Sequence, residues 1–513
     1  MDVSVPERFN AATYFVDRNL DEGRGDNLAV ISGDRELTYW DVAAGVNRAG
    51  NALRELGVEM ENRVFLLLLD GPTFVQAFFG AMKIGAVPVP VNTLLRPADY
   101  RTLLNDSRAK VLIVSPELLP SVEPILGEVS HLKHVLVDGA HEGFASFEET
   151  IAGQPATLEP ADTSRDDVAF WLYTSGTTGR SRAAVHLHHD MVHCVERYAR
   201  AILDMTARDR TFSIAKLFFA YGLGNALYMP FAVGASTVLY PGRPEPKAIF
   251  DVVRRDRPMI FFGVPTAYAA LLQAADSTEA DFSPVRIAVS AGEPLPASIY
   301  QRFLNRFGVE ILDGIGSTEI LHIFLSNRAG QVRPGSSGTP VPGYEVKVVD
   351  DDNQPVAAGE IGNLWVKGDS TCAYYWNSHE STKWAIKGDW IRTGDKYHVD
   401  EDGYFWYDGR ADDMLKPGGI WVSPAEVEGA IIEHPAVLEC AVVGARDDDR
   451  LEKPKAFVVL KDGGGSDELA REIQSFVKGL LAPYKYPRWI EFVDDLPKTA
   501  TGKIQRFKLR QGL

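Results

Sequence analysis

The stretch VFLLLLDGPTFVQAFFGAMKIGAVPVPV, residues 64–91, sets the pattern from which the fold can be predicted. The apolar run over 64–69 predicts a strand, and apolar residues at helical spacing over 74–85 predict a helix. A second apolar run over 86–91 predicts another strand. Strand, helix and strand in this order are typical of parallel strands joined by a crossover helix.

The same rhythm continues along the chain. Further short apolar or β-branched runs lie at 110–115, 134–138, 236–240, 259–264 and 286–292. Helix-like segments separate these runs, so the sequence predicts an α/β fold with mostly parallel sheets covered by helices. At 513 residues the chain exceeds the usual size of one domain, and at least two domains are expected.

The character of the sequence changes near residue 400. The segment VDEDGYFWYDGRADDMLKPGG (399–419) is rich in Gly and Asp and suggests a hinge. Beyond it, strands are expected at 438–445 and 453–462 and a helix at 468–481, with a glycine loop at 463–466. We therefore expect a large N-terminal domain over 1–411 and a small, mobile α+β lid over 412–513.

Composition excludes several classes of protein. The chain has 53 basic and 70 acidic residues, a net charge of −17, which disfavours nucleic acid as a partner. Cys194, Cys372 and Cys440 lie far apart and form no CxxC pair, so neither a disulfide framework nor a zinc knuckle is expected. The N-terminus lacks the features of a secretory signal, and the most apolar stretches are too short or interrupted to span a bilayer. These features predict a cytoplasmic enzyme that does not bind membranes.

The segment TSGTTGRSR (174–182) combines glycines and hydroxyls before a burst of positive charge. Its glycines allow a tight turn that presents N–H groups, and its Ser and Thr side chains add donors, so phosphate is the natural ligand. The G-x-x-x-x-G-K-[ST] pattern does not fit, because Ser181 stands five residues after Gly176. A surface linker rich in Ser, Thr and Gly is the alternative interpretation of this segment alone.

Together with other motifs, the segment LYTSGTTGRSRAAVHLH (172–188) resembles the phosphate loop of the acyl-adenylate-forming superfamily. The other motifs follow in that family's order: KLFFAYGLG (216–224), SAGEPLP (290–296), DGIGSTE (313–319), IRTGD (391–395), GRADDMLKPGG (409–419) and PKTATGKIQR (497–506). Within that family, the segments over 215–231, 313–327 and 481–492 are similar to the benzoate-CoA ligase branch. The resemblance covers essentially the whole chain.

The resemblance implies that the chain joins an aromatic carboxylic acid to coenzyme A at the expense of ATP, with Mg²⁺ as the metal. An acyl-adenylate would form first, with release of pyrophosphate, and CoA would then displace AMP. Both steps build negative charge at phosphorus and oxygen, so positioned cations and hydrogen-bond donors should supply most of the catalysis.

The resemblance also assigns the nucleotide site. The phosphate loop would cradle the β- and γ-phosphates, the segment after residue 290 would lie on the adenine side, and a carboxylate assisted by an arginine would accept the ribose hydroxyls. The start of DGIGSTE would also bind the nucleotide. The residues implied are Thr174, Ser175, Gly176, Thr177, Thr178, Gly179 and Arg182 for phosphate, Ala291, Gly292 and Glu293 for the adenine side, Asp313, Gly314 and Ile315 for the nucleotide, and Asp395 with Arg410 for ribose.

The catalytic residues are implied in the same way. Glu319 resembles the family's Mg²⁺ ligand, which suits a metal held by one carboxylate and phosphate oxygens, and Thr318 would contact the α-phosphate. Lys503 resembles the lysine that bridges the carboxylate and the α-phosphate. Asp412 matches the hinge on which the small domain rotates between the two steps. This rotation would move Lys503 out of the site and bring in the CoA-side residues Lys416, Gly418 and Gly419.

Substrate choice depends on the acyl pocket. Phe219, Ala220 and Tyr221 in one motif, and Gly316, His322 and Ile323 around the Thr-Glu pair, suggest a flat pocket between apolar walls. Benzoate, 2-aminobenzoate or 4-hydroxybenzoate would fit such a pocket. His322 could face a ring substituent or the carboxylate, or it could be a core histidine bonded to the backbone.

The phosphate loop departs from the family in one place. Ser181, Arg182 and Ala183 stand where the family usually has Pro, Lys and Gly. Arginine keeps the charge but offers a planar fork in place of a compact ammonium, which puts the geometry and rate of pyrophosphate departure in question. We predict that Arg182→Lys retains adenylation, and a rate below a tenth of the parent would show a loop adapted to guanidinium.

Three classes of function remain open from the sequence. The first is an aryl-CoA ligase, and the second is an adenylation enzyme that loads a separate carrier protein. Thioester formation with free CoA discriminates between them. The third is a nonenzymatic nucleotide-binding module, which Thr318, Glu319, Asp395 and Lys503 together oppose. Either a monomer or a homodimer is compatible with the sequence.

Overall fold

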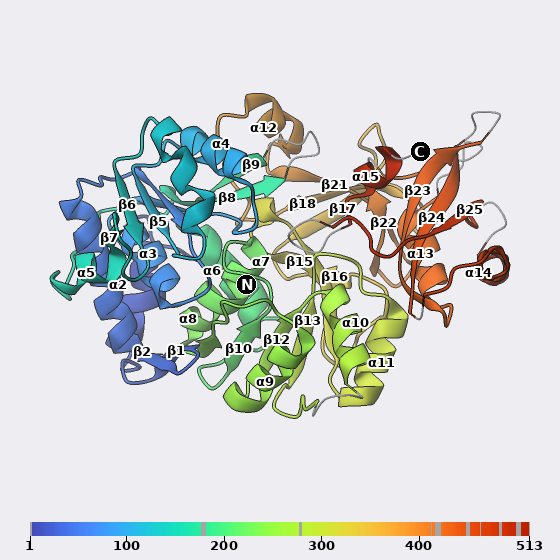
Figure 1. The fold of residues 1–513 in the computed structure, drawn as a ribbon, viewed down its shortest axis with the longest axis horizontal. Coiled ribbons are helices and arrows are strands. Elements are labelled where there is room, and N and C mark those ends of the chain that lie inside the picture. Colours follow the sequence, from blue (N-terminus) through green and yellow to red (C-terminus); the bar gives the residue numbers. More distant parts are fainter. Residues whose placement is uncertain are drawn as a thin grey trace.

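The computed structural model describes residues 3–175, 181–275, 280–411, 413–415, 422–447, 452–461, 463–481, 485–498 and 504–511. Five sheets and the helices that cover them make up this part of the chain (Figure 1). The small C-terminal domain lies at one end of the molecule, and the first parallel sheet lies at the other (Figure 1).

The opening stretch of the sequence forms the first parallel sheet. Its order is β4-β3-β5-β6-β7, and every neighbouring pair is parallel. The strands are β3 (Arg63–Leu67), β4 (Val87–Pro90), β5 (Val111–Val114), β6 (His134–Val137) and β7 (Ala145–Ser146). Their helices are α2 (Tyr39–Glu55), α3 (Pro72–Lys83), α4 (Pro97–Ser107) and α5 (Phe147–Ala152). The predicted strand, helix and strand over 64–91 are thereby confirmed as β3, α3 and β4.

Local chemistry fixes the helices beside this sheet. Thr38 and Asp41 form a capping box at the start of α2, in which each side chain accepts the other residue's backbone N–H. Pro72 opens α3, where its missing N–H costs nothing. A Cβ at Gly80 would lie 3.0 Å from the Val46 carbonyl oxygen, so glycine permits α3 to pack closely against α2.

The second sheet has nine strands in the order β16-β15-β14-β13-β12-β10-β11-β1-β2. Its centre, from β14 to β1, is parallel, and antiparallel strands close both edges. The strands are β1 (Leu28–Ser32), β2 (Arg35–Thr38), β10 (Arg210–Ser213), β11 (Ser236–Val238), β12 (Ile260–Gly263), β13 (Ile287–Ser290), β14 (Ile311–Gly316), β15 (Ile323–Ser326) and β16 (Thr339–Pro340). The helices along it are α7 (Ala220–Leu223), α8 (Met229–Val233), α9 (Pro246–Asp256), α10 (Pro265–Ala274) and α11 (Ala297–Phe307).

Two antiparallel sheets complete the large domain, and the sequence pattern did not predict them. One consists of β8 (Val168–Ser175), β9 (Ser181–Leu187) and β19 (Tyr374–Tyr375). The other contains β17 (Glu345–Val349), β18 (Gly362–Lys367), β20 (Ile386–Lys387), β21 (Trp390–Val399) and β22 (Phe405–Arg410), with α12 (His379–Ala385) beside it. The remaining short elements are η1 (Thr13–Asp17), α1 (Arg18–Asp21), η2 (Leu119–Ser121), η3 (Glu123–Glu128), α6 (Asp190–Cys194), η4 (Val195–Arg200), η5 (Gly224–Tyr228) and η6 (Thr318–Ile320).

The small domain has a core of its own. It comprises β23 (Val437–Arg446), β24 (Glu452–Leu460), β25 (Trp489–Phe492), α13 (Pro424–Ile432), α14 (Asp467–Leu480) and α15 (Arg506–Gln511). A buried cluster that includes Leu415, Val427, Val442 and Ile473 lies between its strands and helices. The predicted strands at 438–445 and 453–462 and the predicted helix at 468–481 are confirmed as β23, β24 and α14. An α/β fold with a large N-terminal domain and a small C-terminal domain is therefore observed.

All three cysteines of the chain are free and buried. Within the described residues, no helix combines the length and the apolar character needed to cross a bilayer.

Candidate active site

The carboxyl edge of the nine-stranded sheet gathers two of the predicted nucleotide segments. β13 and β14 are parallel neighbours, with Ser290 beside Asp313, so both strands end at the same edge. Residues 291–293 follow β13 directly, and 314–316 end β14. Ligands of open α/β sheets bind at this edge. The structure therefore brings Ala291, Gly292, Glu293, Asp313, Gly314 and Ile315 to one place.

Asp313 is a buried carboxyl group at this edge. Its Oδ2 accepts the Leu295 N–H at 3.3 Å, while Oδ1 has no hydrogen-bond partner among the described residues. Burial raises the pKa of Asp313 to about 8. An unpartnered polar atom in a buried position suits a ligand that brings its own hydrogen-bonding groups, as adenine does.

The predicted acyl-pocket residues lie beside the same edge. Phe219 precedes α7, and Tyr221 within α7 donates its hydroxyl to the carbonyl oxygens of Gly263 (3.2 Å) and Val289 (3.3 Å), in β12 and β13. The Tyr221 and His322 ring centroids are 5.7 Å apart. Across β14 and β15, Gly316 pairs with Ile323. The two halves of the predicted pocket, Phe219, Ala220 and Tyr221 with Gly316, His322 and Ile323, therefore lie together.

His322 is a neutral, buried imidazole that is only 2% exposed. Burial lowers its pKa to about 3. Its Nε2 lies 2.9 Å from Asn225 Oδ1, which can only accept, so the proton is on Nε2 and Nδ1 is an acceptor. Nδ1 has no partner among the described residues. A Cβ at Gly224 would lie 2.5 Å from His322 Cδ2, so glycine makes room for the ring.

The backbone of residues 318–320 is held by three hydrogen bonds. The three carbonyl oxygens accept, in order, from His186 Nε2 (2.8 Å), the Cys372 N–H (2.7 Å) and Ser370 Oγ (2.8 Å). Leu321 follows with φ +73°, a conformation that is costly for a non-glycine residue and persists only where the surroundings enforce it. The Thr-Glu pair therefore stands on a fixed segment.

His186 orients that segment from the neighbouring sheet. Its Nδ1 lies 2.7 Å from Asp190 Oδ2, which also accepts the Leu187 N–H at 3.1 Å. The ring stacks on Phe170, with centroids 5.2 Å apart. The buried ring is thus held between the Asp190 carboxylate and the Thr318 carbonyl oxygen, and it fixes the Thr318 peptide.

The Glu319 side chain is held at one of its two oxygens. Tyr375 Oη donates to Glu319 Oε1 at 2.6 Å, while Oε2 has no partner among the described residues. Burial, reinforced by the Glu319 charge, raises the pKa of Tyr375, so the phenol remains a donor. A single half-buried carboxylate with one open oxygen fits Mg²⁺, which takes few protein ligands and fills its shell with phosphate oxygens and water. No group of three or more His, Cys, Asp or Glu suited to a metal was found in the part of the chain that the structure describes.

The phosphate loop connects β8 and β9. These strands are antiparallel, with Thr174 opposite Arg182 and Ser175 opposite Ser181. Gly176, Thr177, Thr178 and Gly179 lie outside the described residues. The Arg182 guanidinium carbon lies 5.0 Å from the centre of the Tyr375 ring, and its buried Nε has no partner among the described residues.

The predicted ribose pair is formed between β21 and β22. Asp395 and Arg410 are opposite each other, and Arg410 Nη1 lies 2.9 Å from Asp395 Oδ1. The charge of Asp395 is the largest cause that raises the pKa of Arg410, and Glu319 adds to the same effect. Glu319 therefore lies within electrostatic range of Arg410.

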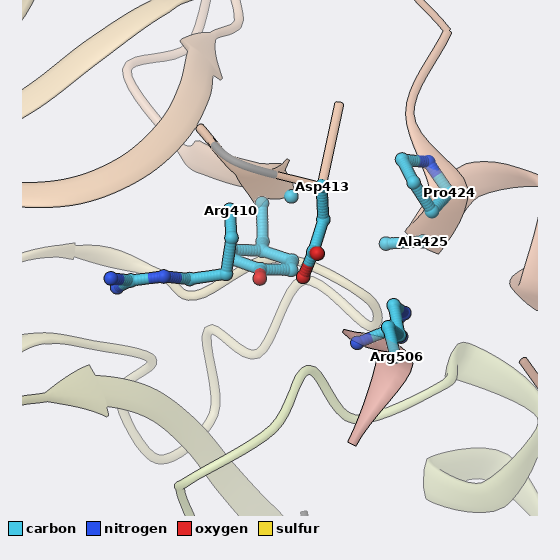
Figure 2. A pocket seen from close by; sticks show the side chains of 7 residues that line it. Arg410, Asp413, Pro424, Ala425 and Arg506 are labelled. Carbon is cyan, nitrogen blue, oxygen red and sulfur yellow. The ribbon is translucent and has the colours of Figure 1, made fainter. Parts of the chain in front are cut away.

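The first residues of the small domain lie next to Arg410 of this pair. A cavity of about 10 Å³, room for one water molecule, is lined by Tyr407, Gly409, Arg410, Asp413, Pro424, Ala425 and Arg506 (Figure 2). Figure 2 shows the Arg410 side chain extending away from Arg506. Arg510 Nη2 lies 2.7 Å from Asp413 Oδ1, and Arg506 forms a two-pronged pair with Glu428. Asp412, Lys416, Gly418, Gly419 and Lys503 lie outside the described residues.

Four residues of this site were not recognised from the sequence. Tyr375, His186, Cys372 and Ser370 hold the Thr-Glu segment through contacts across large sequence separations. The only local signal is a histidine four residues before an aspartate, at His186 and Asp190, and that spacing is common on surfaces. Tyr375 had no signal of its own.

The sheet edge with residues 291–293 and 313–316, the open oxygen of Glu319 and the buried imidazole of His322 beside apolar side chains suit an adenylate-forming enzyme. The chain belongs to the AMP-binding enzyme family: residues 16–376 match the AMP-binding enzyme domain, and residues 426–503 match the AMP-binding enzyme C-terminal domain.

Curated relatives cover nearly the whole chain. The benzoate–CoA ligase of Thauera aromatica is 52% identical over 511 residues, which are 99% of this chain and 97% of that protein. The 4-hydroxybenzoate–CoA/benzoate–CoA ligase of Rhodopseudomonas palustris is 46% identical over 98% of this chain and 94% of that protein.

Solved structures agree over the same length. The anthranilate CoA ligase AuaEII, solved in complex with anthranoyl-AMP, superposes with a TM-score of 0.96 at 47% identity, covering 99% of this chain and 98% of that one. A benzoate CoA ligase from Burkholderia xenovorans LB400 superposes with a TM-score of 0.92 at 46% identity, covering 98% of this chain and 100% of that one.

Proposed function

We propose that this protein is an ATP-dependent aryl-CoA ligase that acts on benzoate or a ring-substituted benzoate. One observation carries the proposal: the open oxygen of Glu319 and the apolar wall of Tyr221 and His322 meet at the same sheet edge. Relatives named as benzoate-CoA and hydroxybenzoate-CoA ligases share 46–52% of the sequence over nearly full length. The carrier-loading alternative is not favoured by these relatives.

The reaction has two balanced halves. The substrate carboxylate attacks the α-phosphate of ATP and forms an acyl-adenylate, with pyrophosphate as the leaving group. The CoA thiol then attacks the acyl carbon, loses its proton, and expels AMP with formation of the thioester. Mg²⁺, when bound with ATP, neutralises charge on the phosphate oxygens.

We assign the nucleotide roles to the residues that surround the edge. Glu319 would offer Oε2 to Mg²⁺, and Thr318 would contact the α-phosphate from a backbone that His186 fixes. Arg182 would place its cation beside the phosphates, together with the loop over 174–179. Asp395, oriented by Arg410, would accept the ribose hydroxyls, and residues 291–293 and 313–315 would flank adenine.

The substrate pocket is proposed as a slot for one aromatic ring. Phe219, Ala220, Tyr221, Gly316 and Ile323 would form its walls, and His322 would present a neutral acceptor. A ring-sized pocket suits benzoate, 2-aminobenzoate or 4-hydroxybenzoate.

The small domain is proposed as the lid, with the boundary at 411/412 and Asp412 as the hinge. In one orientation Lys503 would bridge the carboxylate and the α-phosphate, and in the other Lys416, Gly418 and Gly419 would line the CoA side. We further propose a cytoplasmic location, which the three free, buried cysteines support, and either a monomer or a homodimer.

Carboxylate-dependent AMP release tests the function directly. The protein is supplied with ATP, Mg²⁺ and CoA, and with benzoate, 2-aminobenzoate, 4-hydroxybenzoate, a medium-chain fatty acid or acetate, and the thioester is detected by mass. We expect one benzoate to dominate and its CoA ester to accumulate. Adenylate without capture by CoA would favour carrier loading, and activation of none of the aromatic acids would refute the proposal.

A further inference from the structure

The sheet of β8, β9 and β19 presents one face to the Thr-Glu segment. Alternate residues of a strand share a face, so Arg182 and Ala184 of β9 point the same way. Tyr375 of β19 pairs with Ala184, which makes Arg182 its diagonal neighbour on that face. Diagonal neighbours are within reach of long and aromatic side chains, and the small Ala184 leaves space for both.

Tyr375 makes two contacts from this position. Its hydroxyl donates to Glu319 Oε1 at 2.6 Å, and its ring lies under the Arg182 guanidinium at 5.0 Å. Tyr375 is only 5% exposed, and the backbone on both sides of it is bonded to β9, through Ala373 to Val185 and Trp376 to Ala183, each at 2.9 Å. The ring therefore has little freedom to leave either partner.

We propose that Tyr375 is a positioning residue that acts through Glu319 and Arg182. Its hydroxyl fixes one carboxylate oxygen and turns the other, Oε2, toward the metal that accompanies ATP. Its ring is the platform on which the guanidinium lies, so the cation and the carboxylate on either side of the triphosphate form one rigid unit. This inference rests on the proposed ATP-dependent function.

The same arrangement accounts for arginine at position 182. A planar guanidinium stacks on an aromatic face over a wide area, whereas an ammonium approaches as a point charge. Arginine thus keeps the charge that the phosphates require and adds a stacking contact, with its buried Nε left unpartnered within the described residues.

Tyr375→Phe is the first test, because it removes only the hydroxyl. ATP binding is measured by calorimetry over a series of Mg²⁺ concentrations, with no acid or CoA present. We expect the Mg²⁺ concentration for half-saturation to rise about tenfold, as for other residues that orient a metal ligand. Tyr374→Phe is the matched control, since this phenol on the same strand is 37% exposed and should change nothing.

Two further measurements show whether the effect passes through Glu319. AMP binding in EDTA needs no metal, so Tyr375→Phe should equal the parent there. In a Glu319→Gln background, Tyr375→Phe should have no additional effect on Mg²⁺-dependent ATP binding. An unchanged Mg²⁺ dependence, a loss of AMP binding, or an undiminished effect beside Glu319→Gln would each overturn the inference.

The platform is tested with the arginine. Arg182→Lys should weaken ATP binding about threefold in the parent and in Tyr375→Phe, because the ring remains in both. In Tyr375→Leu, which has no ring, adding Arg182→Lys should not weaken ATP binding any further. Equal costs in all three backgrounds would reject the stacking role. If the parent protein binds no ATP at all, the proposed function itself is wrong. If the parent binds ATP and the Tyr375 variants do not behave as expected, only the inference about Tyr375 is wrong.

Discussion

At the scale of single residues, the exchange at position 182 can be tested in turnover. Arg182→Lys retains the charge and a contact with the Tyr375 ring, so we expect at least a tenth of the parent rate of AMP release. Arg182→Met keeps the length of the side chain but removes its charge. We expect the rate of AMP release to fall about 100-fold in this variant, because the negative charge of the departing pyrophosphate then lacks a cation beside it. A lysine variant as poor as the methionine variant would show that only guanidinium serves this loop.

A second residue makes stability depend on pH. His188 is buried and its Nδ1 accepts the Ala11 N–H at 3.0 Å, and burial lowers its pKa to about 4. A histidine in the unfolded chain titrates near 6.5, so below that pH the unfolded state takes up a proton that the folded state refuses. The free energy of unfolding is therefore highest above pH 6.5 and falls by about 3 kcal/mol as the pH is lowered to 4.

His188→Asn preserves an acceptor near the Nδ1 position without a titratable group. Urea unfolding between pH 7 and 4.5 should show a flatter stability profile for this variant than for the parent. Parallel profiles would contradict the assignment of His188 as a neutral buried acceptor.

The sequence motifs singled out some residues that the structure brings together and gave no signal for others, for a physical reason. Thr318, Glu319 and Tyr221 belong to continuous motifs, and the structure brings these motifs to one edge. Tyr375 and His186 act on the same segment from 56 and 132 residues away. Such contacts depend on strand pairing, which no local pattern encodes.

At the scale of elements, the apolar pattern identified several of the parallel strands, among them β3, β5 and β12, because these strands are short, mostly apolar runs. It missed β10 and β14, whose sequences mix polar residues or glycine with apolar ones. The two antiparallel sheets of the large domain were not predicted, because their strands mix polar and apolar residues on two faces. β19 has only two residues, and its existence follows from pairing with β9 rather than from propensity. The roles of residues in the phosphate loop and hinge remain predictions.

The contact between α15 and α13 supports another prediction. Arg506 binds both oxygens of Glu428, whose burial raises its pKa while the arginine opposes that rise. Arg506→Ala would leave a buried carboxyl without its partner and should destabilise the small domain by about 3 kcal/mol.

Chemical denaturation measures this loss. The double variant Glu428→Leu/Arg506→Met replaces the pair with apolar groups and should recover most of it. Equal stability of the parent and Arg506→Ala would mean that the pair contributes nothing.

At the scale of the whole molecule, one site is proposed to serve two reactions through rotation of the small domain. Lys503→Ala should lower adenylate formation at least 100-fold, because a cation bridging carboxylate and phosphate is removed. Thioester formation from supplied benzoyl-adenylate and CoA should be unchanged. The two half-reactions are followed separately by mass, and loss of both would contradict a role limited to the first.

The burial of the three cysteines has a consequence for an enzyme that generates a thiol-acylating intermediate. Burial raises the pKa of Cys194 to about 12 and also raises those of Cys372 and Cys440. Cys372 donates its backbone N–H to Glu319, yet its sulfur stays a shielded thiol. These three thiols are thereby shielded from acylation. A cysteine introduced on the surface would therefore be labelled by a maleimide dye while the three native cysteines remain unlabelled.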